Sequence, residues 1–526
     1  MRRKYIYICI MLLGSVSSAF AQSIDQIVTL STEQYGTTAR SAAMGGAFGA
    51  LGGDISSINI NPAGIGVFQS NEFSFSLGMF NNIDAETKYG GENRNANKNY
   101  INISNWGFVS AIPVERGNSS LINLNWGISF NRNADFKGVS TASLRNSKSS
   151  RTDAYAAQAT AHNILLDDLR FDDKGYNPYY NPNNPLNSNL AFQGYLIQQK
   201  TDNGGNIIDG QWSSILPQNA TVDQLISKNT TGSINNYTFS FGGNVNHKLY
   251  FGASLDIKDL HYEEQKTYSE QGSDNLKRFT HTEVLNQNGT GVGINLGLIY
   301  RPTNEIRIGA AFHSPTYYTI KEDYYGVMDS RVIYENKEEN VNEKSPMFRG
   351  EYKLNTPLRI NTSVAFIIKR HIIASMDYEY LNYGNATFST KNDVDNYDFT
   401  ETNNDIQQIY KGVHNLRFGL EYRLRENYYF RGGYQLLGNP YEQYIEGYNT
   451  PNSEGQIASK NKHYIISAGV GYRTQKFFVD AAFTHDYSTE NYYQYAEVVD
   501  DYYTESPQTE TIWTKNRFLV TVGFRF

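Results

Sequence analysis

The chain has 526 residues, with 46 Lys and Arg against 53 Asp and Glu, and its formal net charge is −7. A negative net charge disfavours a nucleic-acid partner, because binding to phosphates needs a basic surface. A single cysteine cannot form an internal disulfide. The chain contains 41 Tyr and 28 Phe, although its mean hydropathy is −0.54. Polarity combined with so many interfacial aromatics is typical of membrane barrels.

The first residues have the pattern of a secretory signal peptide. Basic residues at 2–4 precede an apolar run over residues 5–13, and Ala19-Phe20-Ala21 is a small-residue cleavage site. We predict that residues 1–21 are removed together with Cys9, which leaves 43 basic and 53 acidic residues and a charge of −10. No later segment has the roughly 18 consecutive apolar residues of a membrane-spanning helix. The mature chain is therefore an exported soluble protein or an outer-membrane barrel, and the composition favours the barrel.

Small residues dominate the stretch from 36 to 66. A glycine inside a helix costs about 1 kcal/mol relative to alanine, so this stretch is not typical of a core helix. Close contact with surrounding backbone explains better why so many glycines occur together. Asn and Pro at 61–62 then favour a turn. We predict that residues 22–70 form a hatch inside a barrel. The predicted gating residues are Asn61, Pro62, Ala63, Gly45 and Gly46.

From residue 73 onward the dominant pattern is alternation with period two. Within residues 122–131, apolar side chains from Ile122 to Phe130 alternate with small or polar ones. Residues 517–526 repeat this pattern, and the chain ends on an aromatic of the apolar face. Strands of this kind present one face to lipid and the other to a hydrated lumen. We predict an all-β fold, with a transmembrane antiparallel β-barrel over residues 71–526.

About fourteen such strands are present, an even number within the usual bacterial range. Short links alternate with long ones, as expected when both termini lie in the periplasm. The short links include 246–248, 302–304 and 425–427, and the long ones include 81–98, 259–289, 322–347 and 486–511. The predicted strands are 73–80, 100–112, 122–131, 237–245, 249–258, 291–301, 305–318, 348–368, 372–383, 415–424, 428–435, 464–473, 477–485 and 517–526.

The longest link, residues 132–233, carries local structure of its own. Residues 152–169 have the pattern of a helix with an alanine face, and 221–227 could form another helical turn. A link of this length is usually functional or disordered. We predict that it folds over the extracellular mouth, where it would also suit a protein partner.

Charged side chains of both signs project from the predicted inward faces. They are Arg417, Glu421, Arg423, Asp377, Glu379, Arg431 and Arg517. They favour a hydrated, salt-bridged lumen that holds the hatch. The alternative is that an inward arginine binds a substrate carboxylate, and the sequence does not select which one. Inward glycines at 291, 293 and 297 are predicted to make room for the hatch. Pro315 and Pro357 fall within predicted strands, where proline marks an edge, a kink or an opening in the wall.

No pattern indicates catalysis or a cofactor. The glycines at 46, 49 and 52 follow no strand and precede no Lys-Ser/Thr pair, which argues against a phosphate-binding loop. The nine histidines show no metal-ligand spacing on a common helix. We predict no enzyme activity, no cofactor and no metal site, and the substrate-binding residues are not identified at this stage.

Three stretches resemble the FadL-type family of outer-membrane transporters for long-chain fatty acids and other hydrophobic compounds. They are residues 39–66 (ARSAAMGGAFGALGGDISSININPAGIG), 291–320 and 416–441. The resemblance implies a fourteen-stranded barrel whose hatch contains an Asn-Pro-Ala sequence, matched here by residues 61–63. It also implies that substrates leave sideways through a gap in the wall.

These observations predict a multi-pass barrel in the outer membrane of a Gram-negative bacterium, in contact with outer-membrane lipid. Its expected function is the transport of a hydrophobic ligand by plug-gated passive diffusion. The resemblance leaves one alternative, a FadL-like shuttle or assembly subunit of an outer-membrane secretion system. A general porin is a third option, against which the predicted hatch argues.

Overall fold

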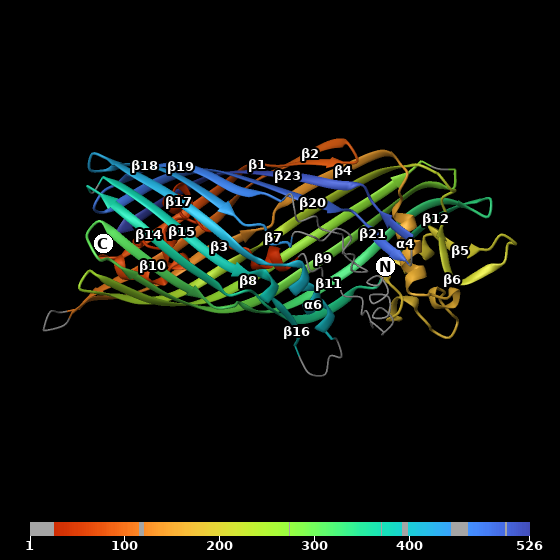
Figure 1. Ribbon diagram of the computed structural model, residues 1–526, viewed down its shortest axis with the longest axis horizontal. Coiled ribbons are helices and arrows are strands. Elements are labelled where there is room, and N and C mark those ends of the chain that lie inside the picture. Colours follow the sequence, from red (N-terminus) through yellow and green to blue (C-terminus); the bar gives the residue numbers. More distant parts are fainter. Residues whose placement is uncertain are drawn as a thin grey trace, which may run out of the picture.

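The computed structural model describes residues 26–114, 120–272, 274–369, 371–391, 398–442, 461–499 and 502–526. The predicted signal peptide, residues 1–21, lies outside them. The main feature is a sheet that closes on itself, because β1 (Glu72–Tyr89) pairs with both β2 (Glu92–Pro113) and the final strand, β23 (Gln508–Arg525). The strands are antiparallel and tilted along a long barrel (Figure 1).

Within the described residues the wall has fourteen strands, as predicted, and three of them consist of two consecutive segments. After β1 and β2 come β3 (Leu121–Asp135) with β4 (Gly138–Ser147), β7 (Val222–Val245), β8 (Leu249–Gln271), β9 (Leu276–Tyr300), and β10 (Ile306–His313) with β11 (Tyr317–Tyr334). The remainder are β13 (Phe348–Asn355) with β14 (Arg359–Ile368), β15 (Ile372–Asn382), β17 (Gly412–Leu424), β18 (Tyr428–Leu437), β19 (His463–Arg473), β20 (Phe477–Tyr493) and β23. Two short strands, β12 (Lys337–Lys344) and β16 (Thr387–Thr390), pair with β11 and β13.

The wall strands extend further than predicted at the end that carries the long links. β8 and β9 remain paired as far as Gln271 and Arg278, so most of the predicted link 259–289 is strand. The links predicted at 81–98 and 322–347 also consist largely of paired strand. The helical turn predicted at 221–227 is wrong, because these residues begin β7 and pair with β8. The apolar alternation disappears there, so the pattern that identifies lipid-facing strands gives no signal.

The outward side chains explain this difference. Near the short links they are large and apolar, as at Leu255 and Ile257 of β8, which are 41% and 37% exposed. Further along β8, from His261 to Gln265, they are polar and equally outward. The apolar side chains form a belt around the barrel, which is the surface that a transmembrane barrel presents to lipid. Beyond this belt the strands continue into water.

The helices lie at two places. Before the barrel come α1 (Gln26–Ser31), α2 (Ala39–Ala43), α3 (Ser57–Ile60) and the 3-10 helix η1 (Pro62–Val67). The link between β4 and β7 holds α4 (Arg151–Ala161), η2 (Leu166–Leu169), η3 (Pro178–Tyr180), α5 (Leu186–Gln193) and the hairpin of β5 (Ile197–Thr201) and β6 (Ile207–Ser214). The predicted helix 152–169 is thus divided between α4 and η2. The other helices are η4 (Tyr383–Asn385) and α6 (Thr400–Ile409), and a small hairpin joins β21 (Ala496–Val499) to β22 (Tyr502–Glu505). None of the described helices is long and apolar enough to cross a membrane.

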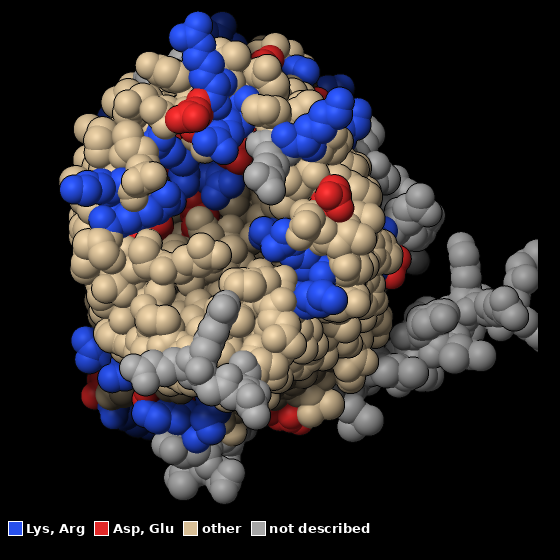
Figure 2. Space-filling model, turned by 90° about the vertical axis from the view of Figure 1, so that its left-hand side faces the viewer, with Lys and Arg blue, Asp and Glu red and all other residues tan. Residues whose placement is uncertain are grey.

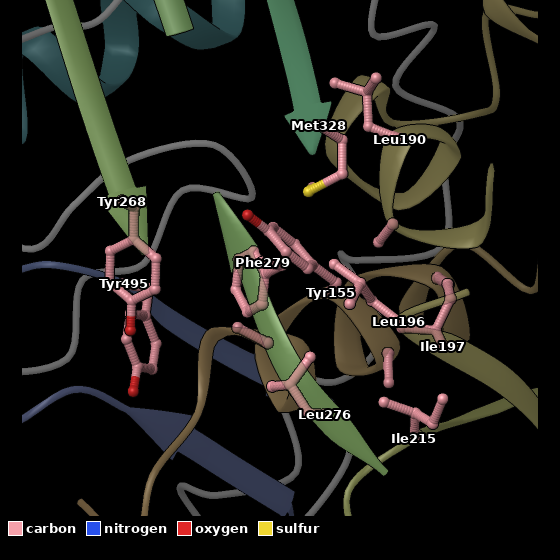
Figure 3. Packing of buried hydrophobic residues seen from close by; sticks show 14 of the residues in the cluster. Tyr155, Leu190, Leu196, Ile197, Ile215, Tyr268, Leu276, Phe279, Met328 and Tyr495 are labelled. Carbon is pink, nitrogen blue, oxygen red and sulfur yellow. The ribbon is translucent and has the colours of Figure 1, made fainter. Parts of the chain in front are cut away.

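We call the elements between β4 and β7, residues 148–216, the cap. Tyr155 of α4 and Leu190 of α5 are buried in one cluster with Phe279 of β9 and Met328 of β11 (Figure 3). Phe279 and Met328 are inward side chains of the wall, beyond the apolar belt. The cap therefore packs against the inside of the wall at the long-link end.

Candidate functional site

Residues 26–71, which we call the N-terminal segment, lie inside the barrel. η1 packs against β3, β7, β8 and β9, whereas α2 packs against β18, β19, β20 and β23. The segment therefore reaches across the lumen between distant parts of the wall (Figure 1). Its helices have six residues or fewer, and isolated helices of that length are unstable in water. The wall must therefore hold them in place.

Glycines face glycines where the segment meets the wall. Gly45 has a φ of 60°, and a β-carbon added there would lie 2.9 Å from the carbonyl oxygen of Phe418 and from the amide nitrogen of Tyr434. A β-carbon on Gly433 of β18 would overlap the amide nitrogen of Gly45. Gly309 of β10 approaches the carbonyl of Gly49 in the same way. The close backbone contact predicted from the small-residue stretch is confirmed.

The Asn61-Pro62-Ala63 turn is fixed to β8 and β9. The Asn61 side chain accepts a hydrogen bond from the Ala63 amide at 3.1 Å and so begins η1. It also donates to the carbonyls of Gly49, at 2.7 Å, and Leu298, at 3.1 Å. Gly45 instead contacts β17 and β18, and Gly46 lies against the side chains of Tyr35 and Arg417. The five predicted gating residues therefore share the segment but contact different sides of the wall.

One of the three inward glycines on β9 makes room for this turn. A β-carbon on Gly297 would overlap the Asn61 side chain, as predicted. The prediction is wrong for Gly291 and Gly293, because the nearest atoms to an added β-carbon belong to residues 314–318 of the neighbouring strand. Sequence alternation places a glycine inward but does not show what fills the space opposite it.

Most of the predicted inward charges hold the N-terminal segment. Glu421 accepts hydrogen bonds from Arg40 of the segment at 2.9 Å and from Arg431 at 2.6 Å. Glu379 pairs with Arg417 at 2.9 Å and accepts a hydrogen bond from the Tyr35 hydroxyl at 2.7 Å. The remaining contacts with the segment are Asp377 with the Gly49 amide and Arg517 with the Gly36 carbonyl. Arg423 differs, because it donates to the Glu426 carbonyl at a short turn, away from the segment.

A buried apolar chamber lies beside the segment, just beyond the belt on the long-link side. Inward side chains of several wall strands line it, among them Ile234, Leu260, Ile320, Leu354, Leu381 and Phe388. α1 occupies this chamber with Ile27 and Leu30, which are 0% and 2% exposed. The first described helix of the chain thus fills the apolar space between these strands.

The wall is interrupted next to this chamber. Pro315 separates β10 from β11, and Pro357 separates β13 from β14 in the adjacent wall strand. Across the two breaks the Thr316 amide donates to the Thr356 hydroxyl at 2.9 Å, and the Thr356 amide donates to the Thr316 carbonyl at 3.1 Å. A side-chain hydroxyl therefore replaces a ladder bond that a continuous strand would supply. Tyr318, two residues beyond Thr316, belongs to the chamber.

At the long-link end, buried polar groups join the cap to the wall. The Tyr155 hydroxyl lies 2.8 Å from Nδ1 of His281, and Arg151 forms an ion pair with Glu283 at 3.1 Å. Both wall residues lie on the part of β9 beyond the belt. Burial lowers the pKa of His281 to about 4, so its imidazole is neutral at pH 7. The cap is thus held by a buried ion pair and by a hydrogen bond to an imidazole that burial keeps neutral at pH 7.

At the opposite end, Lys and Arg side chains gather around a hollow (Figure 2). The described short turns each carry a cation, namely Lys248, Arg301, Lys369, Arg425 and Lys476. These turns adjoin the apolar belt, where long cationic side chains reach the headgroup zone of a bilayer. This end is positively charged although the whole chain is negative.

Three charged residues that lie next to the end of α1 were not identified from the sequence. They are Glu33 of the N-terminal segment, Lys258 of β8 and Arg359 of β14, which lie together in the structure. Alternation along β8 places Lys258 inward, but Glu33 lies outside any helix or strand, so no periodicity predicts its direction. Among the described residues, no group of three or more His, Cys, Asp or Glu side chains is arranged to hold a metal ion.

A closed fourteen-stranded wall, a lipid-facing belt and a lumen filled by a small-residue segment define an outer-membrane transport barrel. The family model described as "Outer membrane protein transport protein (OMPP1/FadL/TodX)" matches residues 196–523, and the chain belongs to this family. The protein is therefore an outer-membrane barrel of a family that transports hydrophobic compounds. The family is described as one of transport proteins.

Solved structures support the fold. The crystal structure of the Pseudomonas putida toluene transporter TodX is 12% identical, with a TM-score of 0.50, and the match covers 94% of this chain and 100% of that one. A second crystal structure of the P. putida toluene transporter TodX is 13% identical over 93% and 98% of the two chains, also with a TM-score of 0.50. No curated protein sequence matches the chain.

Proposed function

We propose that the protein carries hydrophobic small molecules, such as long-chain fatty acids, across the outer membrane by passive diffusion, with the N-terminal segment as the hatch. The apolar chamber is the observation that carries this proposal. It is buried, it adjoins the segment, and Ile27 and Leu30 of α1 occupy it. An apolar ligand gains about 25 cal/mol for each Å² removed from water, so it can replace a short helix that makes the same kind of contact.

In the proposed route the ligand enters past the cap and displaces α1 from the chamber. It then leaves through the wall at the breaks around Pro315 and Pro357, which adjoin Tyr318 of the chamber. An apolar molecule gains by passing directly into the bilayer instead of crossing water. The hydroxyl-mediated link between Thr316 and Thr356 would have to part for this exit to open.

Uptake measurements test the transport itself. Cells that lack the gene, cells that carry it and cells that carry the double variant I27A/L30A would be given a radiolabelled long-chain fatty acid or labelled toluene. We expect faster uptake with the gene, and faster still with the double variant, because truncated side chains fill the chamber less well. Equal uptake with and without the gene for every apolar compound would remove the proposal.

A disulfide across the wall break tests the exit. In T316C/T356C the new cysteines would join two hydrogen-bonded neighbours, a pairing that suits disulfide geometry in adjacent strands. We expect uptake to fall about tenfold when the disulfide forms, which corresponds to roughly 1.4 kcal/mol, and to recover on reduction. The single variants T316C and T356C serve as controls. Full uptake with the disulfide in place would exclude this exit.

The gating role of Asn61, Pro62, Ala63, Gly45 and Gly46 belongs to the same proposal. Their contacts with the wall at β8, β9, β17 and β18 support it, since they fix the segment across the lumen. Deletion of residues 37–66 should raise the single-channel conductance, and an unchanged conductance would contradict it. The family match gives no support to the secretion-shuttle alternative.

A further inference from the structure

A carboxylate of the chain itself lies between two buried cations beneath α1. Glu33 accepts a hydrogen bond from Lys258 Nζ at 2.5 Å, and its second oxygen lies 3.8 Å from a guanidinium nitrogen of Arg359. Lys258 also donates to the Thr316 hydroxyl at 3.0 Å, and Arg359 donates to the carbonyl of Ser31. Lys258 and Arg359 are each 6% exposed. Two wall strands therefore build this pair of cations into the interior.

The other polar groups nearby have different partners. His313 contacts the carbonyl of Ile60 at 3.0 Å, and Asp256 accepts hydrogen bonds from Thr238 and Asn295 at 2.8 Å each. Glu33 is thus the acid that forms the ion pairs with Lys258 and Arg359 among the residues that the structure describes. Burial acts to raise the pKa of Glu33, but Arg359 and Lys258 together hold it well below its usual range. The site binds an ionised carboxylate.

The same short stretch of chain also supplies an apolar group. Leu30 lies in the apolar chamber, and Glu33 follows three residues later. One small cavity is lined by Leu30, Glu33, Lys258, Tyr318 and Arg359. Residues 27–33 therefore present an apolar part to the chamber and a carboxylate to the cations, which are the two chemical features of a long-chain carboxylic acid.

We propose that Lys258 and Arg359 bind the carboxylate of the transported ligand, and that Glu33 occupies their site as a built-in substitute until the ligand arrives. This inference rests on the proposed transport function and narrows its substrate to apolar carboxylic acids. The exchange replaces one carboxylate by another, so neither buried cation is left unpaired, which would be strongly unfavourable. α1 lies in the chamber and Glu33 lies on the adjacent cations, so one ligand that fills both sites would displace both. The first residues of the N-terminal segment, 26–33, would then be released from the wall.

Two ligands that differ only in the head group test the carboxylate site. Oleate and oleyl alcohol would be titrated into the purified mature barrel in detergent, for the wild type, E33Q, and E33Q combined with K258M or R359M. We expect E33Q to bind oleate about tenfold more tightly, a gain of roughly 1.4 kcal/mol, with the affinity for oleyl alcohol unchanged. Removal of either cation from the E33Q variant should cancel that gain.

E421Q is the matched control, because it removes an acid that contacts the segment at Arg40, away from the cavity. It should change the affinities for both ligands by the same factor. If E33Q also changes both affinities equally, Glu33 only anchors the segment and the inference is wrong, although transport of neutral ligands would stand. If neither ligand binds to the wild type or to E33Q, the proposed function itself fails.

Displacement of the N-terminal segment by a ligand can also be measured directly, in a protein that keeps Lys258 and Arg359. Ser31 is 2% exposed, so a cysteine placed there should react slowly with a maleimide in the ligand-free S31C variant. We expect oleate to accelerate this reaction several-fold more than oleyl alcohol does. Equal acceleration by the two ligands would contradict the inference.

Discussion

At the residue scale, the contact between the N-terminal segment and the wall depends on side chains that are absent. Gly45, Gly49 and Gly66 of the segment each lie against backbone of the wall, and glycines of the wall lie opposite. No other residue type allows two backbones to approach so closely. The small-residue composition of residues 36–66 is therefore explained by the surface it packs against.

The glycines at 432 and 433 provide a matched pair for a test. In G433A the new methyl group would overlap the Gly45 amide, whereas in G432A it would meet nothing closer than the Ser467 carbonyl oxygen at 4.0 Å. We expect G433A to lower the free energy of unfolding by about 1–3 kcal/mol, the usual effect of overpacking, and to raise the single-channel conductance. Thermal unfolding and conductance traces of the two variants measure this. Equal effects of both substitutions would contradict the packing described for Gly45.

At the element scale, α4 is tied to the wall by a group that titrates. The folded-state pKa of His281 is about 4, against 6.5 for the free side chain. Because protonation favours the undocked state, the stabilisation from neutral His281 is complete above about pH 6.5 and is lost as the pH falls towards 4. The difference corresponds to about 3 kcal/mol at most.

Cap docking is therefore expected to weaken between pH 6.5 and 4. Limited proteolysis of the cap at pH 7 and pH 5 measures this, since undocked segments are cut more rapidly. H281Q is the control, because glutamine keeps a polar group without titrating. The cleavage rates at the two pH values should differ less in H281Q than in the wild type. Burial also raises the pKa of Glu270, but this residue is present in both proteins and contributes equally to both. Identical pH dependence of the two proteins would exclude His281 as the cause.

Elements of the lipid-facing belt could be predicted from the sequence, and those beyond it could not. Ile122 to Phe130 alternate because one face contacts lipid, and this rule located all fourteen wall strands. Past the belt the outward side chains are polar, so the lipid-facing alternation ends. β8 and β9 were therefore predicted to stop near residues 258 and 291, although they pair to residues 271 and 278. Hydrogen bonding between backbones, which leaves no mark on composition, sets these boundaries.

At the scale of the whole molecule, the candidate site depends on closure of the barrel. Glu33 and Lys258 are 225 residues apart in the chain, and no local pattern links them. The sequence predicted inward charges and a small-residue hatch, and it left open which arginine faces a ligand. The position of α1 inside the apolar chamber follows only from the closed wall, since each lining strand contributes one or two side chains.

A structure determined with a saturating long-chain fatty acid would show whether the ligand replaces α1 in the apolar chamber. We expect ligand density in the chamber between Ile234, Leu354 and Phe388, with Ile27 and Leu30 displaced. Ligand bound elsewhere, with α1 still seated in the chamber, would contradict it.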